Sequence, residues 1–293
     1  LPASIGLGIT QINGTISCWL ALWAAPWAPA VLTYAEHMIY LPLGMFATAL
    51  GTVLLPVFSR QKALLQHDEM KTTVNNCLRH LMFVMIPAAA GMIALSTPII
   101  RVLFERGSFT PFSTELTARA LAFYAPGLFA FSICKIFVPA FYASKDMVTP
   151  LKVGVCSVVL NFALNVTFII ILPREYKHAG IAIGTVIAEM INGSTLAFLF
   201  HRRMGSPGWQ TIFSSLARIL LCAILMAIAA GYVMHFLEAG TTPGLKGQII
   251  NLLLSIAAGV GVYLFLSFIL CRNELREIYS AIRTRSQPAS VQD

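Results

Sequence analysis

A single lysine, Lys135, lies inside an otherwise apolar run from Leu121 to Tyr142. A charge at the centre of a membrane-spanning helix costs about 2.5–3.5 kcal/mol even on lenient scales. A lysine kept there is therefore expected to face a watery cavity and an anion. Because lysine binds phosphate as a point charge, we expect Lys135 to contact an anionic substrate, most simply through phosphate. The alternative is that its ammonium group reaches the cytoplasmic headgroups.

Glu36 and His37 are adjacent near the outer end of another apolar stretch. Neighbouring side chains on a helix point about 100° apart, so both can reach one cavity without stacking on each other. Histidine is cationic only when protonated, and glutamate can accept that proton. The pair is therefore a candidate for substrate contact or proton sensitivity. The alternative is an interfacial pair that reaches water, because Pro29 lies only a turn or two earlier.

Other polar side chains also fall inside apolar stretches. They are Gln11, Asn13 and Ser17 in the first stretch, Asn161 and Asn165 in the fifth, and Thr185, Glu189 and Asn192 in the sixth. We expect them to converge on one polar site between helices, where Glu189 must be paired, protonated or bound to an ion. For the two asparagines, which share one helix face, hydrogen bonding between helices explains the pattern at least as well as a cation site.

The composition identifies the elements that carry these residues as membrane helices. Hydrophobic residues make up 57% of the chain, charged residues only 11%, and the mean hydropathy is +0.77, whereas soluble domains carry about 25% charged residues. A spanning helix needs about 20 apolar residues. We therefore predict an all-α polytopic bundle of eight transmembrane helices. The predicted spans are 3–23, 30–58, 81–100, 121–142, 153–172, 179–200, 219–237 and 249–271.

The basic residues predict the orientation of this bundle. With both chain ends in the cytoplasm, thirteen of the 20 lysines and arginines lie on the cytoplasmic side, five on the other side and two in or beside spans. This bias is typical of membrane topology, so the net charge of +8 does not indicate nucleic acid as a partner. The long connection at about 59–80 is predicted to be an amphipathic helix on the membrane surface, with a solvated linker as the alternative.

Motifs for covalent chemistry are not found in this sequence. It has no H-E-x-x-H, no G-x-S-x-G, no P-loop and no carboxylate cluster suited to Mg²⁺, so we predict no enzyme activity and no metal site. The six cysteines are scattered and are interpreted as small buried residues. The chain begins at Leu1 without a methionine or a basic signal-peptide region, and we expect it to be a piece of a longer protein.

Three segments of the chain resemble the MurJ (MviN) family of lipid II flippases, within the multidrug/oligosaccharidyl-lipid/polysaccharide exporter superfamily. The segments are Leu1–Gly6 with Gln11, Ile12 and Asn13; Tyr34–Met38 with Leu41–Gly44, Ala49–Thr52 and Leu54–Pro56; and Lys135 with Pro139–Ala143, Asp146, Thr149 and Pro150. His178–Gly180 and Asn192 also fit. The resemblance covers essentially the whole chain.

The resemblance implies a role in building the cell wall and cell shape, in the bacterial inner membrane. Family members have fourteen transmembrane helices, and this chain is similar to the last eight. Residues 1–203 would form the C-terminal transport lobe, 204–271 two additional helices with a groove for the lipid tail, and 272–293 a cytoplasmic tail. Such proteins work by alternating access around a cationic cavity that holds the pyrophosphate headgroup of lipid II. The partners implied are lipid II, membrane lipids and the N-terminal lobe.

The chain departs from the family pattern at two places. Where Glu36 and His37 stand, the family usually has an Asp-Arg pair, and histidine supplies that charge only when protonated. Some members have a sodium site with carboxylate ligands. The comparable positions here are Ser17, Asn161, Asn165 and Thr185, all neutral, which weighs against sodium, so no cofactor is predicted.

Other functions remain open at this stage. Within the same superfamily, the chain could be another polysaccharide-lipid flippase or a drug/cation antiporter, although a cation exporter would want acidic residues in place of Lys135. A membrane enzyme acting on polyprenyl phosphates would need an acidic metal motif in preceding sequence. A pseudotransporter that serves as a scaffold is the remaining alternative, and a full set of cavity arginines in the other lobe would argue against it.

Overall fold

The structure is a computed structural model that describes residues 2–240 and 244–272. Within these ranges it is all-helical, as predicted. The helices are α1 (Pro2–Ala24), α2 (Ala28–Pro42), the π-helix η1 (Leu43–Thr48), α3 (Ala49–Ala63), α4 (His67–Ala94), α5 (Ser96–Phe104), α6 (Pro111–Tyr124), α7 (Gly127–Ala143), α8 (Val148–Ile171), α9 (Lys177–Met204), α10 (Trp209–Gly240) and α11 (Leu245–Leu270). The cytoplasmic tail predicted at 272–293 lies, apart from Arg272, outside the described residues.

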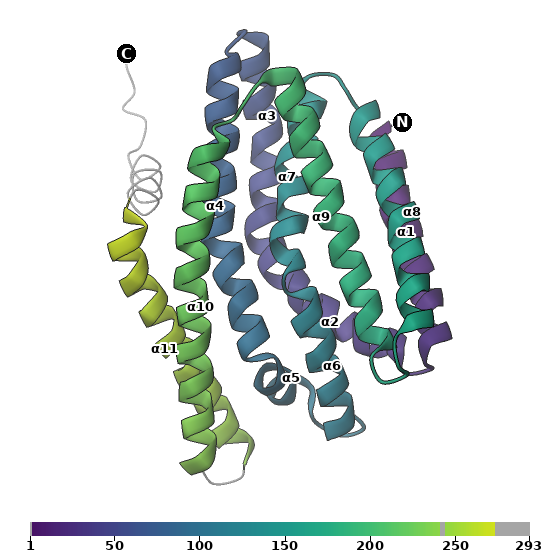
Figure 1. Cartoon of the computed structure of the whole chain (residues 1–293), viewed down its shortest axis with the longest axis vertical. Helices are drawn as coiled ribbons and strands as arrows, with labels where there is room; N and C mark the ends of the chain where they lie inside the picture. The colour runs from purple at the N-terminus through teal and green to yellow at the C-terminus, as the bar shows by residue number, and fades with distance from the viewer. Residues whose placement is uncertain (1, 241–243, 273–293) are drawn as a thin grey trace, which may run out of the picture.

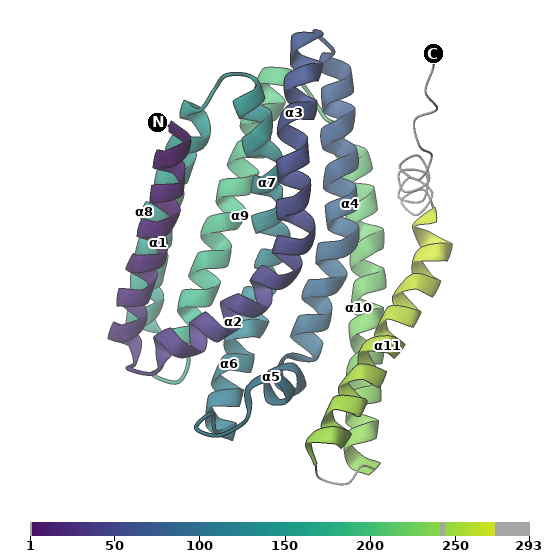
Figure 2. The same cartoon turned by 180° about the vertical axis from the view of Figure 1, so that it is seen from behind.

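The helices form a layered membrane bundle (Figures 1 and 2). At one side α11 packs on α10, and α10 packs on α4. The middle is occupied by α7, which packs against α3, α4 and α9, and the other side by α8, which packs against α1 and α9. The start of α1, the α3–α4 turn, the α7–α8 loop and the α9–α10 turn all lie at the same end (Figure 1). The predicted topology requires this arrangement.

The membrane architecture is confirmed, but the count of eight spans is not. Six helices of the described residues are long and apolar enough to cross a membrane, or seven if the bent pair α6 and α7 is one span. One of the six is the continuous helix Ala28–Ala63, which combines α2, η1 and α3. The first predicted span is helical as α1, but it is not among the six.

Several of the predicted spans are interrupted where prolines remove a backbone donor. Pro42 ends α2 and is followed by the π-helical turn η1, a common form of helix irregularity. Pro126 lies at the break between α6 and α7, whose axes are bent by 45°. The span predicted at 81–100 is wrong at both ends, because α4 already begins at His67 and stops at Ala94, and a separate helix, α5, carries Pro98.

The connection at 59–80 does not form a helix of its own. Its residues belong to the end of α3 and the start of α4, which are joined by a tight turn at Leu64–Gln66. Val74 and Leu78 are buried in the bundle core, whereas Leu64 and Leu65 are exposed at the turn. Only the apolar residues on α4 therefore pack into the bundle, because this helix begins well before its apolar stretch.

The boundary predicted after residue 203 falls at a turn rather than inside a helix. Gly205 and Gly208 adopt φ values of +91° and +89°, which favour glycine over residues with a side chain. The chain thereby reverses between α9 and α10. The last two helices are held to the rest by α4, where the Tyr263 hydroxyl donates a hydrogen bond of 2.7 Å to the Phe83 carbonyl. A separate role for these two helices remains a prediction.

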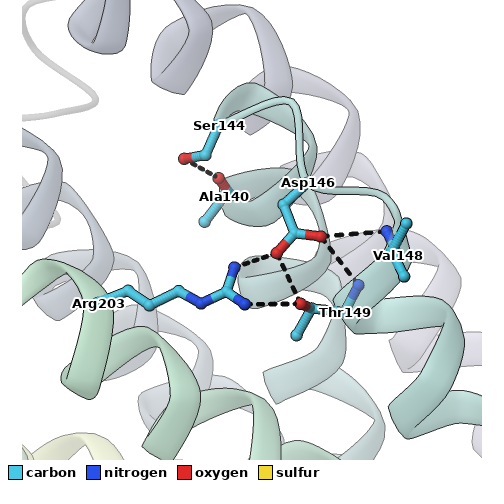
Figure 3. A network of polar contacts seen from close by, with 6 residues as sticks. All are labelled: Ala140, Ser144, Asp146, Val148, Thr149 and Arg203. Atoms are coloured by element: carbon cyan, nitrogen blue, oxygen red, sulfur yellow. Dashed lines mark hydrogen bonds and ion pairs between the residues drawn. The ribbon is translucent and has the colours of Figure 1, made fainter.

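The α7–α8 loop is held by one carboxylate, Asp146 (Figure 3). Its Oδ1 accepts the backbone N–H groups of Val148 and Thr149 at 3.1 and 2.9 Å, as an N-cap residue does. Its Oδ2 accepts the Thr149 hydroxyl at 2.6 Å and pairs with the Arg203 guanidinium. Arg203 also donates to the Thr149 hydroxyl at 3.0 Å. This cluster, the Asp146 latch, ties the start of α8 to the end of α9.

The charge of Asp146 makes the latch sensitive to pH. Burial acts to raise the pKa of Asp146, but the hydrogen bonds from Thr149 and the charge of Arg203 outweigh it and hold the pKa below its usual value. A carboxyl whose pKa is lowered on folding stabilises the fold above its unfolded pKa of about 3.9. That stabilisation is lost as the pH falls through the lower pKa of the folded state.

Replacing Asp146 with asparagine tests the latch. In Asp146→Asn the amide oxygen can still accept the N–H groups at the start of α8, but the ion pair is lost. Because Arg203 is half-exposed, we expect the full-length protein to lose only about 0.5–1 kcal/mol of stability at pH 7, measured by thermal unfolding. The difference from wild type should shrink as the pH is lowered below 4. Arg202→Gln at the neighbouring exposed position is the control, and an equal loss in that variant would contradict the assignment.

Candidate functional site

Four of the predicted polar residues form one hydrogen-bonded network between α1, α8 and α9. The Asn165 amide nitrogen donates to Asn161 Oδ1 at 2.9 Å, and the Asn161 amide nitrogen donates to Thr185 Oγ1 at 3.1 Å. The Ser17 hydroxyl approaches Asn161 Oδ1 from α1 at 3.5 Å. Both asparagines are buried. These four residues, the amide network, bring together polar side chains from three of the predicted spans, the first, fifth and sixth.

The amide network depends on the close approach of α8 and α9. Gly180 and Gly184 face α8, and a Cβ at either position would fall within 2.8 Å of an α8 side-chain atom. At Gly184 the obstacle is Asn165 Oδ1, only 2.3 Å from the Cβ position. The two glycines are four residues apart, a spacing of small residues that is typical of closely packed membrane helices. Here it allows α8 and α9 to approach each other. It also leaves the room in which the Asn165 side chain lies.

A buried tyrosine extends the network toward α2. The Tyr124 hydroxyl, on α6, donates a hydrogen bond of 3.1 Å to Glu36 Oε1 and lies within hydrogen-bonding reach of Thr185. The polar contacts therefore run from Ser17 on α1 to Glu36 on α2. Tyr124 was not predicted as a site residue, because an aromatic residue in an apolar run is expected to be core. Only the need of a buried hydroxyl for a partner could have indicated its role.

Glu189 lies apart from the amide network. Its carboxylate accepts a hydrogen bond of 3.3 Å from Asn192 on the same helix, and it lies within hydrogen-bonding reach of the Cys134 thiol on α7. Tyr40 on α2 is within electrostatic range of both Glu36 and Glu189. Glu189 thus has hydrogen-bonding partners other than the two asparagines of α8, and its expected charge pairing, protonation or ion binding stays a prediction.

The remaining predicted residues of the first two spans do not enter the network. Gln11 and His37 are exposed, and Asn13 is partly buried, with a buried Oδ1 that has no hydrogen-bond partner. Glu36 is turned toward Tyr124 while His37 is exposed, in agreement with the angle between neighbouring helical side chains. Substrate contact by Gln11, Asn13 or His37 stays a prediction.

Lys135 is the only exposed residue of α7. The helix is otherwise covered by α3, α4 and α9, and the lysine backbone lies against Gly51 of α3, where a Cβ would be 3.1 Å from the Lys135 carbonyl oxygen. Within the part of the chain that the structure describes, its ammonium group has no ion pair or hydrogen bond. A single positive charge is thus presented from the middle of a helix that is otherwise packed.

Two cavities of the described chain lie away from Lys135. One of about 700 Å³ lies beside the α1–α2 turn, where Trp23, Trp27, Phe112 and Arg119 are among its lining residues. The other, of about 280 Å³, lies between the end of α3 and the start of α4. Neither is lined by Lys135, Glu36 or His37. Among the described residues, no group of three or more histidines, cysteines or acidic residues could hold a metal ion.

Comparison with known proteins assigns the sequence to a family. The family model described as "Lipid II flippase MurJ" matches residues 1–249. A relative from Rickettsia prowazekii (strain Madrid E), named "Probable lipid II flippase MurJ", is 35% identical over 80% of this chain and 45% of its own length. A relative of the same name from Rhizobium meliloti (strain 1021) is 32% identical over 100% of this chain and 54% of its own length. The chain spans about half the length of these curated relatives.

Solved structures show the same likeness. The chain is similar to a structure titled "Lipid II flippase MurJ, inward closed conformation", with a TM-score of 0.74 and 26% identity, covering 92% of this chain and 53% of that one. A transporter of the MOP superfamily from Pyrococcus furiosus is similar in fold alone, with a TM-score of 0.57 and 14% identity over 91% of this chain and 63% of that one.

The contact between α8 and α9 gives a direct test of the amide network. Gly184→Ala places a methyl group onto Asn165 Oδ1, so the asparagine or the helix must move, and overpacking of this kind costs about 1–3 kcal/mol. We expect thermal unfolding of the full-length protein at a lower temperature. Gly154→Ala on α8 is the control, because nothing lies within 4 Å of its Cβ position. Equal melting temperatures for both variants would contradict the geometry of the network.

Proposed function

This chain belongs to the MurJ family of lipid II flippases, and on that premise we propose that it forms one half of a transporter for lipid II. The transporter moves this peptidoglycan precursor from the cytoplasmic to the periplasmic leaflet of the bacterial inner membrane. The missing half of the path is supplied by the N-terminal lobe, since the relatives are about twice as long as this chain. The lipid changes sides without covalent chemistry, so the protein is a transporter rather than an enzyme.

The observation that carries the proposal is the position of Lys135. Its ammonium group is exposed at the centre of α7, while the neighbours of the lysine on that helix are covered by α3, α4 and α9. An uncompensated cation at such a position is costly in hydrocarbon but favourable beside a phosphate. Lipid II carries its sugar-peptide headgroup on a pyrophosphate. We assign Lys135 to bind that pyrophosphate during passage.

The physical problem is the passage of a charged headgroup across about 30 Å of hydrocarbon. A cation on the wall of the path lowers the electrostatic barrier, and two lobes that rock against each other keep the path from opening to both sides at once. The positive charge of Lys135 also favours an anionic substrate over the cationic drugs of an antiporter. Glu36 and His37, on α2, are proposed to contact the headgroup as well.

Replacing Lys135 tests this assignment in the full-length protein. A hydrogen bond to a charged group contributes about 1.5–3 kcal/mol, so Lys135→Ala should reduce the affinity for the pyrophosphate by at least about tenfold. We expect the variant to fail to rescue growth of a strain depleted of its flippase. Lys135→Arg should retain activity, because it keeps the charge.

The matched control is Lys152→Ala, which removes an exposed lysine near the start of α8 and should rescue growth normally. All variants are compared at equal membrane levels, determined by immunoblotting. Rescue by Lys135→Ala at the wild-type level would rule out the role of this lysine in transport.

A further inference from the structure

The amide network occupies the positions at which the family resemblance implies a sodium site in some members. Such a site uses carboxylate ligands, whereas Ser17, Asn161, Asn165 and Thr185 are all neutral. We propose that in this protein these four side chains close on one another and hold α1, α8 and α9 together without a bound cation. We call this hydrogen-bonded contact of four uncharged side chains the neutral clamp, because it holds the three helices without an ion.

The first support for the proposal is the hydrogen bonding of the side-chain oxygen atoms. A hard cation needs several oxygen ligands at once. Asn161 Oδ1 already accepts from Asn165 and faces the Ser17 hydroxyl. Thr185 Oγ1 accepts from Asn161 and donates to the Ile181 carbonyl at 2.9 Å. Asn161 Oδ1 and Thr185 Oγ1 are therefore engaged by hydrogen-bond donors, whereas the Ser17 hydroxyl is itself a donor.

The fourth oxygen, Asn165 Oδ1, is buried and has no hydrogen-bond partner. It lies against the backbone of Gly184, where even a Cβ would be only 2.3 Å away, so there is no room for an ion on that side. The Ser17 hydroxyl and this one amide oxygen are too few to coordinate a cation. On its other side, the Asn165 side chain contacts Asn161 directly, because its amide nitrogen donates a hydrogen bond of 2.9 Å to Asn161 Oδ1.

The second support is the balance of charge. Asn161 and Asn165 are 2% and 0% exposed, and an ion enclosed with them would carry an uncompensated positive charge, which is costly when buried. The carboxylate linked to this cluster by hydrogen bonds is Glu36, and it is reached only through Tyr124 and Thr185. Carboxylates at positions 17 and 165 would supply the missing charge within the network itself.

The consequence is that the junction of α1, α8 and α9 does not depend on sodium. This statement concerns stability and stands apart from the substrate. Its extension to transport rests on the proposed function, because it states that lipid II flipping by this protein continues when sodium is replaced by potassium.

The test compares ion-specific stability in two versions of the purified full-length protein. The melting temperature of the wild type is measured in NaCl, KCl and choline chloride at equal ionic strength, and we expect no sodium-specific shift. The double variant Ser17→Asp/Asn165→Asp places two carboxylates beside Asn161 and Thr185. With sodium at about a hundredfold excess over its dissociation constant, we expect its melting temperature to rise by about 2–3 °C in NaCl relative to KCl.

Ser17→Asn is the control of matched size and neutral charge, and it should melt at the same temperature in the three salts. If the double variant does not fold in any salt, the single variant Asn165→Asp and the wild-type measurement carry the test. A saturable, sodium-specific rise in the melting temperature of the wild type that is lost in Asn161→Ala would overturn the proposal. So would the absence of any sodium response in a folded double variant, because missing charge would then not be the reason.

A transport measurement separates this inference from the proposed function. Flipping of lipid II by the reconstituted full-length protein is followed with sodium and with potassium as the only cation. Equal rates agree with the neutral clamp, and flipping in sodium alone overturns it. No flipping in either salt, with a related flippase active in the same vesicles, would contradict the proposed substrate, while the melting temperatures would still decide the question of the clamp.

Discussion

The arrangement of this bundle depends on the need of every buried polar side chain for a partner inside hydrocarbon. An unpaired polar group at membrane depth costs several kcal/mol, and this chain places several of them on helices that meet. Asn161 and Asn165 solve the problem together by facing Thr185 and Ser17 on neighbouring helices. Hydrogen bonds therefore select which faces of α1, α8 and α9 meet, a choice that apolar packing between equally apolar helices leaves open.

Lys135 differs from the buried polar residues in being exposed. The two carboxylates within the spans have hydrogen bonds, Glu36 with Tyr124 and Glu189 with Asn192. Lys135 alone on α7 is exposed and lacks a polar contact among the described residues. In the proposed function, a lipid phosphate passing beside Lys135 satisfies this charge only during transport. The rule that explains the amide network thus supports the proposal that Lys135 lies on the substrate path.

Much of the membrane architecture could be predicted from the apolar stretches alone, because their length is set by the thickness of the bilayer. The breaks could be placed only in part. Pro42 and Pro126 lie at two of the breaks, but the π-helical turn and the separate helix α5 depend on how neighbouring helices pack. The connection at 59–80 was misjudged because amphipathic residues look the same on a membrane surface and in a helical hairpin.

For the site, too, the sequence predicted which residues share a helix face but not which helices lie beside that face. The spacing of Asn161 and Asn165 placed both on one face, and the structure joins them to Ser17 and Thr185 as expected. Tyr124 escaped prediction because nothing in its local sequence distinguishes a core tyrosine from one that links two polar groups. Glu189 was placed in the wrong cluster, since helical periodicity gives the face of a residue but not the neighbouring helix that covers it.

The distribution of rigid and irregular segments bears on how such a lobe can move. The start of α8 and the end of α9 are joined by Asp146 and Arg203, and the two helices are joined farther along by the amide network. The Ser157 hydroxyl adds a hydrogen bond of 3.2 Å to the Ala188 carbonyl between them. This pair is expected to move as one body. The irregular points lie instead in the helices that carry Glu36 and Lys135, at η1 and at the bend between α6 and α7. A helix bends most readily where its backbone hydrogen bonds are already interrupted. We therefore expect changes of shape during transport beside the residues proposed to contact the substrate. α8 and α9 are expected to keep their relative position during these changes.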